Sequence, residues 1–234
     1  LRRSRGLGDV YKRQVCVLGI GRNYRDHATE LGNDAPERPM VFAKAPFRVT
    51  GEGDPIVLPA CCETEQVDYE GELAVLLGRD AKDVALEDAL SYVAGYAAAN
   101  DITARWWQKH GSGGQFVRGK SFDSFCPIGP WRSAEEVSDP QALRIVTTLN
   151  GEVVQDGATA DMIFSVREII AHLSQDTTLP AGTGLLTGTP SGVGAGRTPP
   201  RFLRGGDSVE VSIAGVGTLR NPVQAYPSAS SSSS

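Results

Sequence analysis

The sequence predicts an α+β fold, and three observations lead to this class. Strand-like segments outnumber helix-like ones, and the two kinds do not alternate strictly as in a doubly wound sheet. The 234 residues are 40% hydrophobic and 22% charged, which is ordinary for a globular protein and excludes disorder, collagen and coiled coil. No internal repeat or linker divides the chain, so we expect a single domain over residues 15–226.

Both ends of the chain are expected to lie outside this domain. Residues 1–14 contain DVYKRQ, which resembles the translated end of a sequencing adaptor, so this segment is predicted to be artefactual or disordered. Residues 227–234, PSASSSSS, are polar and low in complexity, and they are predicted to be a disordered tail.

The first half of the domain is predicted to contain strands and one clear short helix. Apolar runs predict strands over residues 15–20, 40–44 and 56–58. The segment NYRDHATELG predicts a helix with Asn23 as its N-cap and Gly32 as its stop. The clearest strand is VDYEGELAVLL, residues 67–77, which alternates at first and then becomes continuously apolar.

The second half continues this mixture of strands and short helices. Helices are predicted for LEDALSYV (86–93), for DITARWWQKH (101–110, ending at Gly111) and for the amphipathic FSVREIIAHLS (164–174). VAGYAAAN (93–100) is predicted to be a buried run of small residues. Strands are predicted over residues 143–149, 184–188, 208–213 and 217–221, with a polar hairpin at NGEVVQDG (150–157).

The charge distribution argues against two classes of partner. The formal net charge is −5, but residues 1–14 carry five basic and one acidic side chain, so the remaining chain carries −9. An acidic body repels phosphate, and we expect no nucleic-acid partner and no anionic membrane surface. The apolar run VCVLGIG is too short to span a bilayer. Four cysteines without C-x-x-C spacing favour a reducing, cytoplasmic location.

Three carboxylates in the strand over residues 67–77 give the sharpest chemical signal. Asp68, Glu70 and Glu72 alternate, so the period of two places them on one face. Like charges this close repel strongly unless water covers them or a cation lies between them. An exposed face is the alternative interpretation, but the strand continues into AVLL, which favours burial and a cation.

The ligand types indicate which cation would bind. Oxygen ligands without nearby cysteines or paired histidines favour Mg²⁺, Mn²⁺ or Ca²⁺ over Zn²⁺. A further oxygen ligand is needed, and Asp101 is a candidate. Its alternative role is to cap the helix predicted to follow it.

A histidine and a carboxylate are spaced to interact on the first predicted helix. His27 and Glu30 lie three residues apart, so their side chains can touch. The carboxylate would hold the imidazole in one tautomer and raise its basicity, as a water-activating general base requires. A solvated surface pair is the alternative.

Two lysines and one loop are also unusual. Lys44 interrupts an apolar strand and Lys120 precedes the aromatic turn SFDSF, although lysines in such settings usually reach solvent. The loop TGTPSGVGAG, residues 187–196, lacks the residue order of a phosphate or dinucleotide loop. It is predicted to offer backbone amides to a carboxylate or a developing oxyanion.

Seven segments, in this order, resemble the fumarylacetoacetate hydrolase family. They are GRNYRDHATELG (21–32), VFAKAP (41–46), DYEGELAVLLGR (68–79), NDITARWWQ (100–108), RGKSFDSFCPIGP (118–130), LNGEVVQDG (149–157) and TGTPSGVG (187–194). The resemblance covers nearly all of residues 15–223. It implies a mixed β-sandwich roll, usually a homodimer, with Mg²⁺ or a similar ion.

The resemblance also implies roles for individual residues. The metal ligands would be Glu70, Glu72 and Asp101, with Asp68 as a neighbour. The catalytic residues would be the water-activating dyad His27 and Glu30, on a segment that acts as a lid in similar enzymes, and the active-site lysine Lys120. The substrate's carboxylate or oxo groups would be held by Arg22, Arg105, Gln108 and Thr189. Trp106 departs from the family pattern, in which an acidic residue is more frequent.

The implied function is metal-dependent hydrolysis of a carbon–carbon bond in acylpyruvate-type 2,4-dioxo acids such as fumarylpyruvate, a reaction of aromatic catabolism. The metal ion would act as Lewis acid and stabilise the enolate. His27 would deprotonate water while Lys120 stabilises the oxyanion or protonates the product. Oxaloacetate decarboxylation or 2-hydroxyhepta-2,4-diene-1,7-dioate isomerisation is the alternative, because both need the enolate without attacking water. A non-catalytic binding protein is the third hypothesis.

Overall fold

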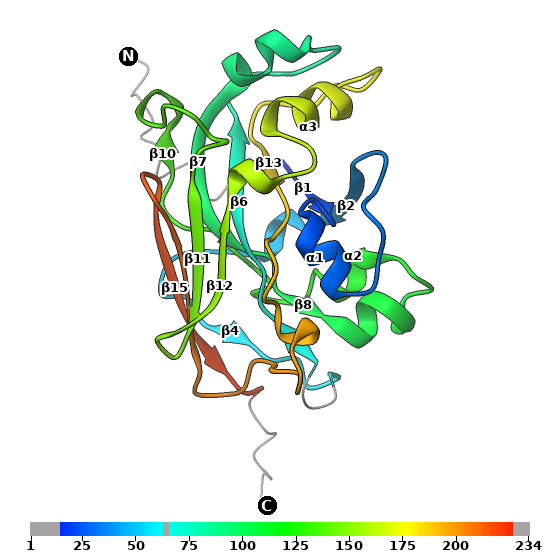
Figure 1. Ribbon diagram of the computed structural model, residues 1–234, viewed down its shortest axis with the longest axis vertical. Helices are drawn as coiled ribbons and strands as arrows, with labels where there is room; N and C mark the ends of the chain where they lie inside the picture. The colour runs from blue at the N-terminus through cyan, green and yellow to red at the C-terminus, as the bar shows by residue number, and fades with distance from the viewer. Residues whose placement is uncertain (1–14, 63–65, 227–234) are drawn as a thin grey trace, which may run out of the picture.

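The computed structural model describes residues 15–62 and 66–226 and shows two main sheets with short helices beside them (Figure 1). One sheet has six strands in the order β10-β7-β6-β13-β1-β2, and the other has five in the order β12-β11-β14-β15-β4. The predicted α+β class is therefore confirmed. The predictions for residues 1–14 and 227–234 lie outside the described residues.

The strands have the following bounds. The six-stranded sheet contains β1 (Cys16–Gly21), β2 (Met40–Lys44), β6 (Gly71–Leu77), β7 (Val93–Asn100), β10 (Arg132–Ser133) and β13 (Thr183–Leu186). The five-stranded sheet contains β4 (Ile56–Val57), β11 (Arg144–Leu149), β12 (Glu152–Ala158), β14 (Ser208–Ile213) and β15 (Gly217–Gln224). Two short pairs are β3 (Val49–Thr50) with β9 (Cys126–Pro127), and β5 (Val67–Asp68) with β8 (Thr103–Ala104).

The helices are short. The α-helices are α1 (Arg25–Glu30), α2 (Phe116–Gly119) and α3 (Val166–Leu173). Single turns of 3₁₀-helix or slightly longer segments cover Pro46–Arg48, Leu86–Tyr92, Ala134–Glu136, Thr159–Asp161 and Gly194–Gly196, and a π-helix covers Trp107–Gly111. None of the helices within the described ranges is long and apolar enough to cross a bilayer.

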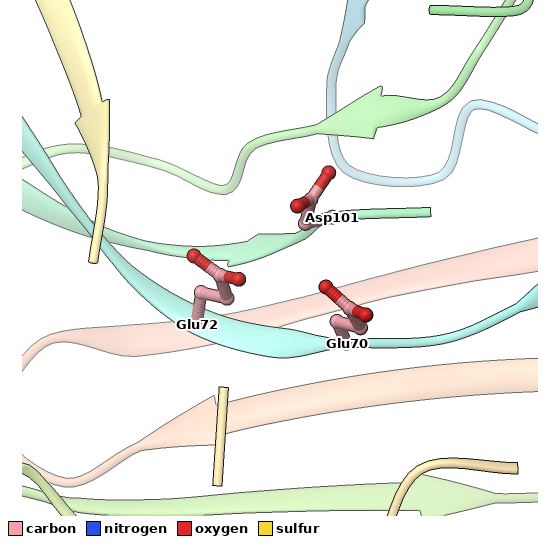
Figure 2. Close-up of side chains that lie close together, drawn as sticks. All are labelled: Glu70, Glu72 and Asp101. Atoms are coloured by element: carbon pink, nitrogen blue, oxygen red, sulfur yellow. The ribbon is translucent and has the colours of Figure 1, made fainter. Parts of the chain in front are cut away.

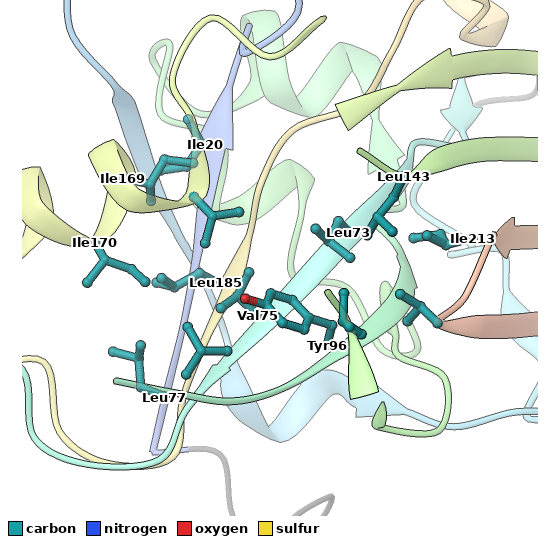
Figure 3. Packing of buried hydrophobic residues seen from close by; sticks show 14 of the residues in the cluster. Ile20, Leu73, Val75, Leu77, Tyr96, Leu143, Ile169, Ile170, Leu185 and Ile213 are labelled. Carbon is teal, nitrogen blue, oxygen red and sulfur yellow. The ribbon is translucent and has the colours of Figure 1, made fainter. Parts of the chain in front are cut away.

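The main hydrophobic core lies between the two sheets and under α3. β6 is buried along its whole length, as its apolar run predicted, and it pairs with β7 on one side and β13 on the other. Figure 3 shows Leu73 and Val75 of β6 packed among side chains of β7, β13, α3 and the five-stranded sheet. Burial of such side chains contributes roughly 1.5–3 kcal/mol each, so this core holds β6 and β7 in fixed register.

Local sequence signals explain several of these elements. Asn150 and Gly151, both with positive φ (55° and 82°), form the tight turn of the predicted β11–β12 hairpin. The Ser165 side chain accepts the Glu168 amide, and the Ser165 amide donates to Glu168 Oε2 at 2.7 Å. This capping box starts the amphipathic helix α3. The strand predictions for residues 15–20 and 40–44 are also confirmed.

Three local predictions were wrong. Asn23 does not cap α1, which begins after Tyr24 without a side-chain cap. Its buried amide instead donates to the carbonyl oxygens of Phe164 (2.9 Å) and Thr187 (2.8 Å), tying the segment before α1 to two distant loops. The predicted strand over residues 67–77 is interrupted at residues 69–70, which separates β5 from β6.

The third error concerns DITARWWQKH. Its first residues form β8, which pairs with β5, and only its second half is helical. Asp101 is therefore not a helix N-cap. At Asp101 the chain leaves β7 and continues into β8, which pairs with β5. The segment that carries Asp101 therefore lies beside the segment that carries Glu70 and Glu72.

Candidate metal centre and catalytic pocket

Glu70, Glu72 and Asp101 form a compact buried cluster. Glu70 immediately precedes β6, Glu72 lies in its second position, and Asp101 directly follows β7. Antiparallel pairing of β6 with β7 brings these ends together, and the Asp101 amide donates to the Glu70 carbonyl oxygen at 2.8 Å. One carboxylate oxygen from each residue lies within 4.8 Å of the other two. Figure 2 shows the three carboxyl groups close together, at the start of β6 and the end of β7.

Two buried lysines contact this cluster. Lys120 Nζ donates to Glu70 Oε2 at 2.8 Å, to Asp101 Oδ2 at 2.5 Å and to the Thr103 hydroxyl at 2.8 Å. Lys44, the last residue of β2, donates to Asp101 Oδ1. Both lysines are almost fully buried, so neither reaches solvent as its sequence setting suggested. Each carboxylate oxygen of Asp101 thus contacts one ammonium group.

The three carboxylates differ in their electrostatic surroundings. Burial opposes ionisation of Glu70, but Lys120 and Arg105 outweigh it and lower the pKa of this carboxyl. Burial, Asp101 and Glu70 together raise the pKa of Glu72 well above its usual value. Glu72 has no lysine partner, and its Oε2 accepts only the Gly188 amide at 2.7 Å among its described contacts.

This charge balance fits a hard divalent cation. Four buried carboxylates, those of the cluster and Asp68, face three buried cations, so ionisation of all four would leave one excess negative charge in the interior. An uncompensated buried charge is costly, and carboxylate oxygens are preferred ligands of Mg²⁺, Mn²⁺ and Ca²⁺. Glu70, Glu72 and Asp101 would hold such an ion.

The predicted dyad is formed on α1. His27 Nδ1 lies 2.8 Å from Glu30 Oε1, and His27 is buried while its ring borders the pocket. The second oxygen of Glu30, Oε2, accepts the Gly192 amide at 2.9 Å. The carboxylate is therefore fixed from both sides and can orient the imidazole as a general base requires.

Arg105 and Gln108 lie beside the cluster. Arg105 Nη1 is 2.6 Å from Glu70 Oε1 and donates to Gln108 Oε1 at 3.2 Å. Nη2 of the same guanidinium lies 2.8 Å from Asp68 Oδ2 but without hydrogen-bond geometry, so this buried donor is unsatisfied. Arg105 lines the pocket, and a buried guanidinium there suits an anionic ligand.

Thr189 and Arg22 complete the set predicted to bind substrate. The Thr189 hydroxyl donates to the Gly71 carbonyl at 2.9 Å and accepts from Gln155 at 2.8 Å. These bonds tie the loop of residues 187–196 to β6 and β12. Arg22 is half-buried at the pocket wall, with a left-handed backbone (φ 55°) that is uncommon outside glycine and occurs often at functional sites.

These residues line one cavity of about 320 Å³. Glu70, Glu72 and Lys120 are among its lining residues. Every residue predicted to be catalytic or substrate-binding lines the cavity except Glu30, which acts behind His27. Asp101 does not line it either, because Lys44 and Lys120 cover its two oxygens.

Other wall residues were not identified from the sequence. They are apolar side chains on β1, β2 and α2, Leu31 directly after α1, the glycines Gly21 and Gly114, and the polar Asn33 and Lys109. Lys44, which the sequence singled out, does not line the cavity and shares the buried face of β2 with Phe42. Lys109 gave no sequence signal, because an exposed lysine in a helical turn is ordinary.

The backbone amides of the glycine-rich loop, residues 187–196, donate to carboxylates of the protein. The amides of Gly188, Gly192, Gly194 and Ala195 donate to Glu72, Glu30 and Asp68. The sequence predicted that these amides donate to a carboxylate or to a developing oxyanion. They donate to carboxylates, which belong to the protein itself. Gly188 has φ +93°, and a Cβ there would lie 2.7 Å from Asn23 Cβ, so the loop needs glycine at this point.

Trp106, which departs from the family pattern, does not line the cavity. It is half exposed and meets Trp107 edge-on, with ring centroids 5.1 Å apart. A Cβ on Gly111 would collide with both rings, so glycine permits this packing. The departure therefore affects the outside of the π-helix and not the cavity wall.

Comparison with known proteins identifies the family. A family model, fumarylacetoacetate (FAA) hydrolase C-terminal, matches residues 16–224. The chain belongs to the fumarylacetoacetate hydrolase family. The predicted family is thereby confirmed, and the family model places the chain among enzymes.

Two curated relatives of this family member are named for the same activity. The chain is 50% identical over 210 residues to the oxaloacetate tautomerase YisK of Bacillus subtilis, covering 88% of this chain and 69% of that protein. It is 42% identical over 208 residues to the mitochondrial oxaloacetate tautomerase FAHD2A of Homo sapiens, covering 88% of this chain and 66% of that protein. The chain thus spans about two thirds of the length of these relatives.

A solved structure of similar fold contains a metal ion. The fumarylpyruvate hydrolase of Pseudomonas aeruginosa, in complex with Mn²⁺ and pyruvate, superposes with a TM-score of 0.82 at 32% identity, over 90% of each chain. The fold of this family is thus shared with an enzyme that binds a divalent metal.

Proposed function

We propose that this family member catalyses the keto–enol tautomerisation of oxaloacetate or a similar 2-oxo dicarboxylate, with a divalent ion held by Glu70, Glu72 and Asp101. The observation that carries the proposal is the three-carboxylate cluster, of which Glu70 and Glu72 line a small cavity that is also lined by cationic side chains. The names of the relatives that are 50% and 42% identical support this reaction over others of the family.

The cavity suits a small anion with two carboxylates. Its volume of about 320 Å³ lies at the low end of the range for small-molecule sites. Arg105 lies next to the metal cluster, whereas Arg22 and Lys109 line other parts of the wall. One carboxylate would bind at Arg105 and the second would be attracted by Arg22 and Lys109.

A residue of the protein can stabilise the enolate form of the substrate. A divalent ion at the cluster would supply Lewis acidity that favours the enolate form of a 2-oxo acid. Burial opposes the charged form of Lys120, but Asp101 and Glu70 outweigh it and raise the pKa of this ammonium. Lys120 therefore stays protonated and stabilises negative charge on the substrate's 2-oxygen. Tautomerisation moves one proton from that oxygen to carbon 3 and consumes no water.

A direct assay tests this proposal. Decay of the ultraviolet absorbance of enol-oxaloacetate is followed with protein and Mn²⁺, with Mn²⁺ alone, and after chelation. We expect acceleration over the metal-only rate, and loss of that acceleration on chelation. A rate equal to that of Mn²⁺ alone would reject tautomerisation as the function.

The dyad supports hydrolysis of an acylpyruvate as the second candidate function. The contact of His27 with Glu30 at 2.8 Å is the arrangement that activates water, and tautomerisation does not require it. We predict that His27→Ala lowers fumarylpyruvate hydrolysis about 10²–10⁴-fold while oxaloacetate tautomerisation changes less than about threefold. His172→Ala, a change in α3 away from the cavity, is the matched control. Equal loss of both activities would contradict this division of roles.

A further inference from the structure

A second buried network lies beside the metal cluster and centres on Asp68. This side chain is fully buried and is not one of the three clustered carboxylates. Its Oδ1 accepts the amides of Tyr69 (2.9 Å) and Gly194 (2.7 Å), and its Oδ2 accepts the Ala195 amide at 2.9 Å. Asp68 therefore holds the end of the glycine-rich loop against β5.

The same carboxylate holds Arg105. Arg105 Nε donates to Asp68 Oδ2 at 2.8 Å, and Asp68 is the largest attractive contribution that raises the pKa of Arg105 against its burial. The opposite side of the guanidinium faces Glu70 and Gln108. Asp68 thus fixes one edge of the group while the other remains at the cavity. A guanidinium held in this way loses less rotamer freedom when it binds a carboxylate.

Glycine at position 194 makes this arrangement possible. A Cβ there would lie 2.6 Å from Asp68 Oδ1 and 2.0 Å from the Arg201 carbonyl oxygen. Only a residue without a side chain brings its amide this close to the carboxylate. The loop also donates to Glu30 through Gly192, so the loop is connected to the arginine through Asp68 and to the dyad through Glu30.

We propose that Asp68 is a positioning residue for substrate binding, which orients Arg105 toward the carboxylate of a 2-oxo acid in the cavity. The inference rests on the proposed function for the class of ligand. Asparagine has the same shape but replaces one acceptor oxygen by an N–H donor. Because both oxygens of Asp68 accept hydrogen bonds, Asp68→Asn places that donor against an amide of the loop or against Arg105.

The test measures binding, so that it is separate from turnover. Oxalate, a planar dianion that resembles the enolate of a 2-oxo acid, is titrated calorimetrically into protein saturated with Mn²⁺, after the Mn²⁺ affinity of each variant has been measured. The variants are Asp68→Asn, Arg105→Gln, the double variant, and Asp80→Asn. Asp80 is the matched control because it also accepts a loop amide, that of Ala181 at 2.8 Å, but is exposed and away from the cavity.

We expect Asp68→Asn to weaken oxalate binding about tenfold, in line with loss of a charge-assisted hydrogen bond. The double variant should bind no more weakly than Arg105→Gln alone, and Asp80→Asn should bind as the wild type does. Unchanged affinity in Asp68→Asn, effects that multiply in the double variant, or no oxalate binding to the wild type would each overturn the proposal.

A second variant covers the case in which Asp68→Asn does not fold. Arg105→Lys keeps the charge but cannot bond Asp68 and Gln108 together, so we expect weaker oxalate binding with an unchanged melting temperature. Unchanged oxalate affinity in this variant would overturn the proposal. Tautomerase turnover of the wild type is measured separately, so a failure of the proposed function is distinguished from a failure of this inference.

Discussion

Two regions of the molecule contain ion pairs between basic and acidic side chains, but the pairs are exposed in one region and buried in the other. On the five-stranded sheet, Arg144 pairs with Asp156 and Arg220 with Glu210, and these pairs are largely solvent-exposed. Around the metal cluster, lysines and carboxylates pair inside the protein, with side chains at most 6% exposed. Exposed pairs contribute little because water solvates either partner alone, whereas removal of one buried partner leaves a charge without solvent.

The difference shows that the buried charges are not there for stability. Well-packed apolar residues of similar volume would be as stable as buried ion pairs or more so. Ionisation of Glu72 is a further cost in the metal-free protein, because burial, Asp101 and Glu70 all raise the pKa of this carboxyl. We infer that this region exchanges stability for the capacity to bind a cation, and each prediction below tests that contrast.

Removal of the one ligand without a lysine partner should have the largest effect on metal binding. Glu72→Gln keeps the size of the side chain and removes the excess charge, so we predict that Mn²⁺ affinity falls at least about 100-fold and tautomerisation falls to background. The melting temperature of the metal-free protein should not fall, because the neutral side chain is easier to bury. Mn²⁺ calorimetry checks this, with Asp156→Asn as the exposed control. Wild-type affinity in Glu72→Gln would show that the cluster is not the metal site.

Removal of a buried cation should instead cost stability. Lys44→Met leaves the buried Asp101 with one fewer cationic partner, so we predict a loss of about 3–5 kcal/mol in the free energy of unfolding of the metal-free protein. Urea denaturation measures it, and saturating Mn²⁺ should restore part of the loss because the ion would replace the missing charge. A loss below about 1 kcal/mol in the free energy of unfolding would mean that the Lys44–Asp101 pair contributes no more than an exposed ion pair.

The contrast between these regions also explains what the sequence could predict. The apolar run after Glu72 correctly indicated that Asp68, Glu70 and Glu72 are buried, although only Glu72 lies on β6 and the strand is interrupted before it. The pairing of β5 with β8 was not predicted, since the helical signal of RWWQKH extended over residues whose structure is set by a strand distant in sequence. Contacts of Asp68 with the glycine-rich loop depend on residues more than 120 positions apart, and no local pattern encodes them.

The family motifs supplied what local patterns could not. Asp101, His27 and Lys120 come from separate segments, and their meeting in one site follows from the resemblance rather than from periodicity. The glycine-rich loop was correctly predicted to present amides to a carboxylate. That these carboxylates belong to the protein could not be predicted, because the sequence does not tell which acidic side chains are buried without a solvent shell.

Substitution of Lys109, an exposed charged residue that lines the cavity, should have an intermediate effect on activity. Lys109 lines the cavity but remains in contact with solvent, so its attraction for the second substrate carboxylate is screened. We predict that Lys109→Gln raises KM for oxaloacetate about three- to tenfold with kcat unchanged, and that added salt reduces the difference. Lys82→Gln, on an exposed segment away from the cavity, is the matched control. A changed kcat with unchanged KM would contradict this role.

The exposed pairs should have the smallest effect of all. Arg144 lies on β11 and Asp156 on the neighbouring β12, and both side chains are well exposed at 66% and 45%. We predict that Arg144→Gln leaves the melting temperature, Mn²⁺ affinity and turnover unchanged within error, because water solvates the released Asp156. Thermal denaturation compared directly with Lys44→Met measures the contrast between the two regions. If Arg144→Gln destabilised the protein as strongly as Lys44→Met, burial would not be the property that separates them.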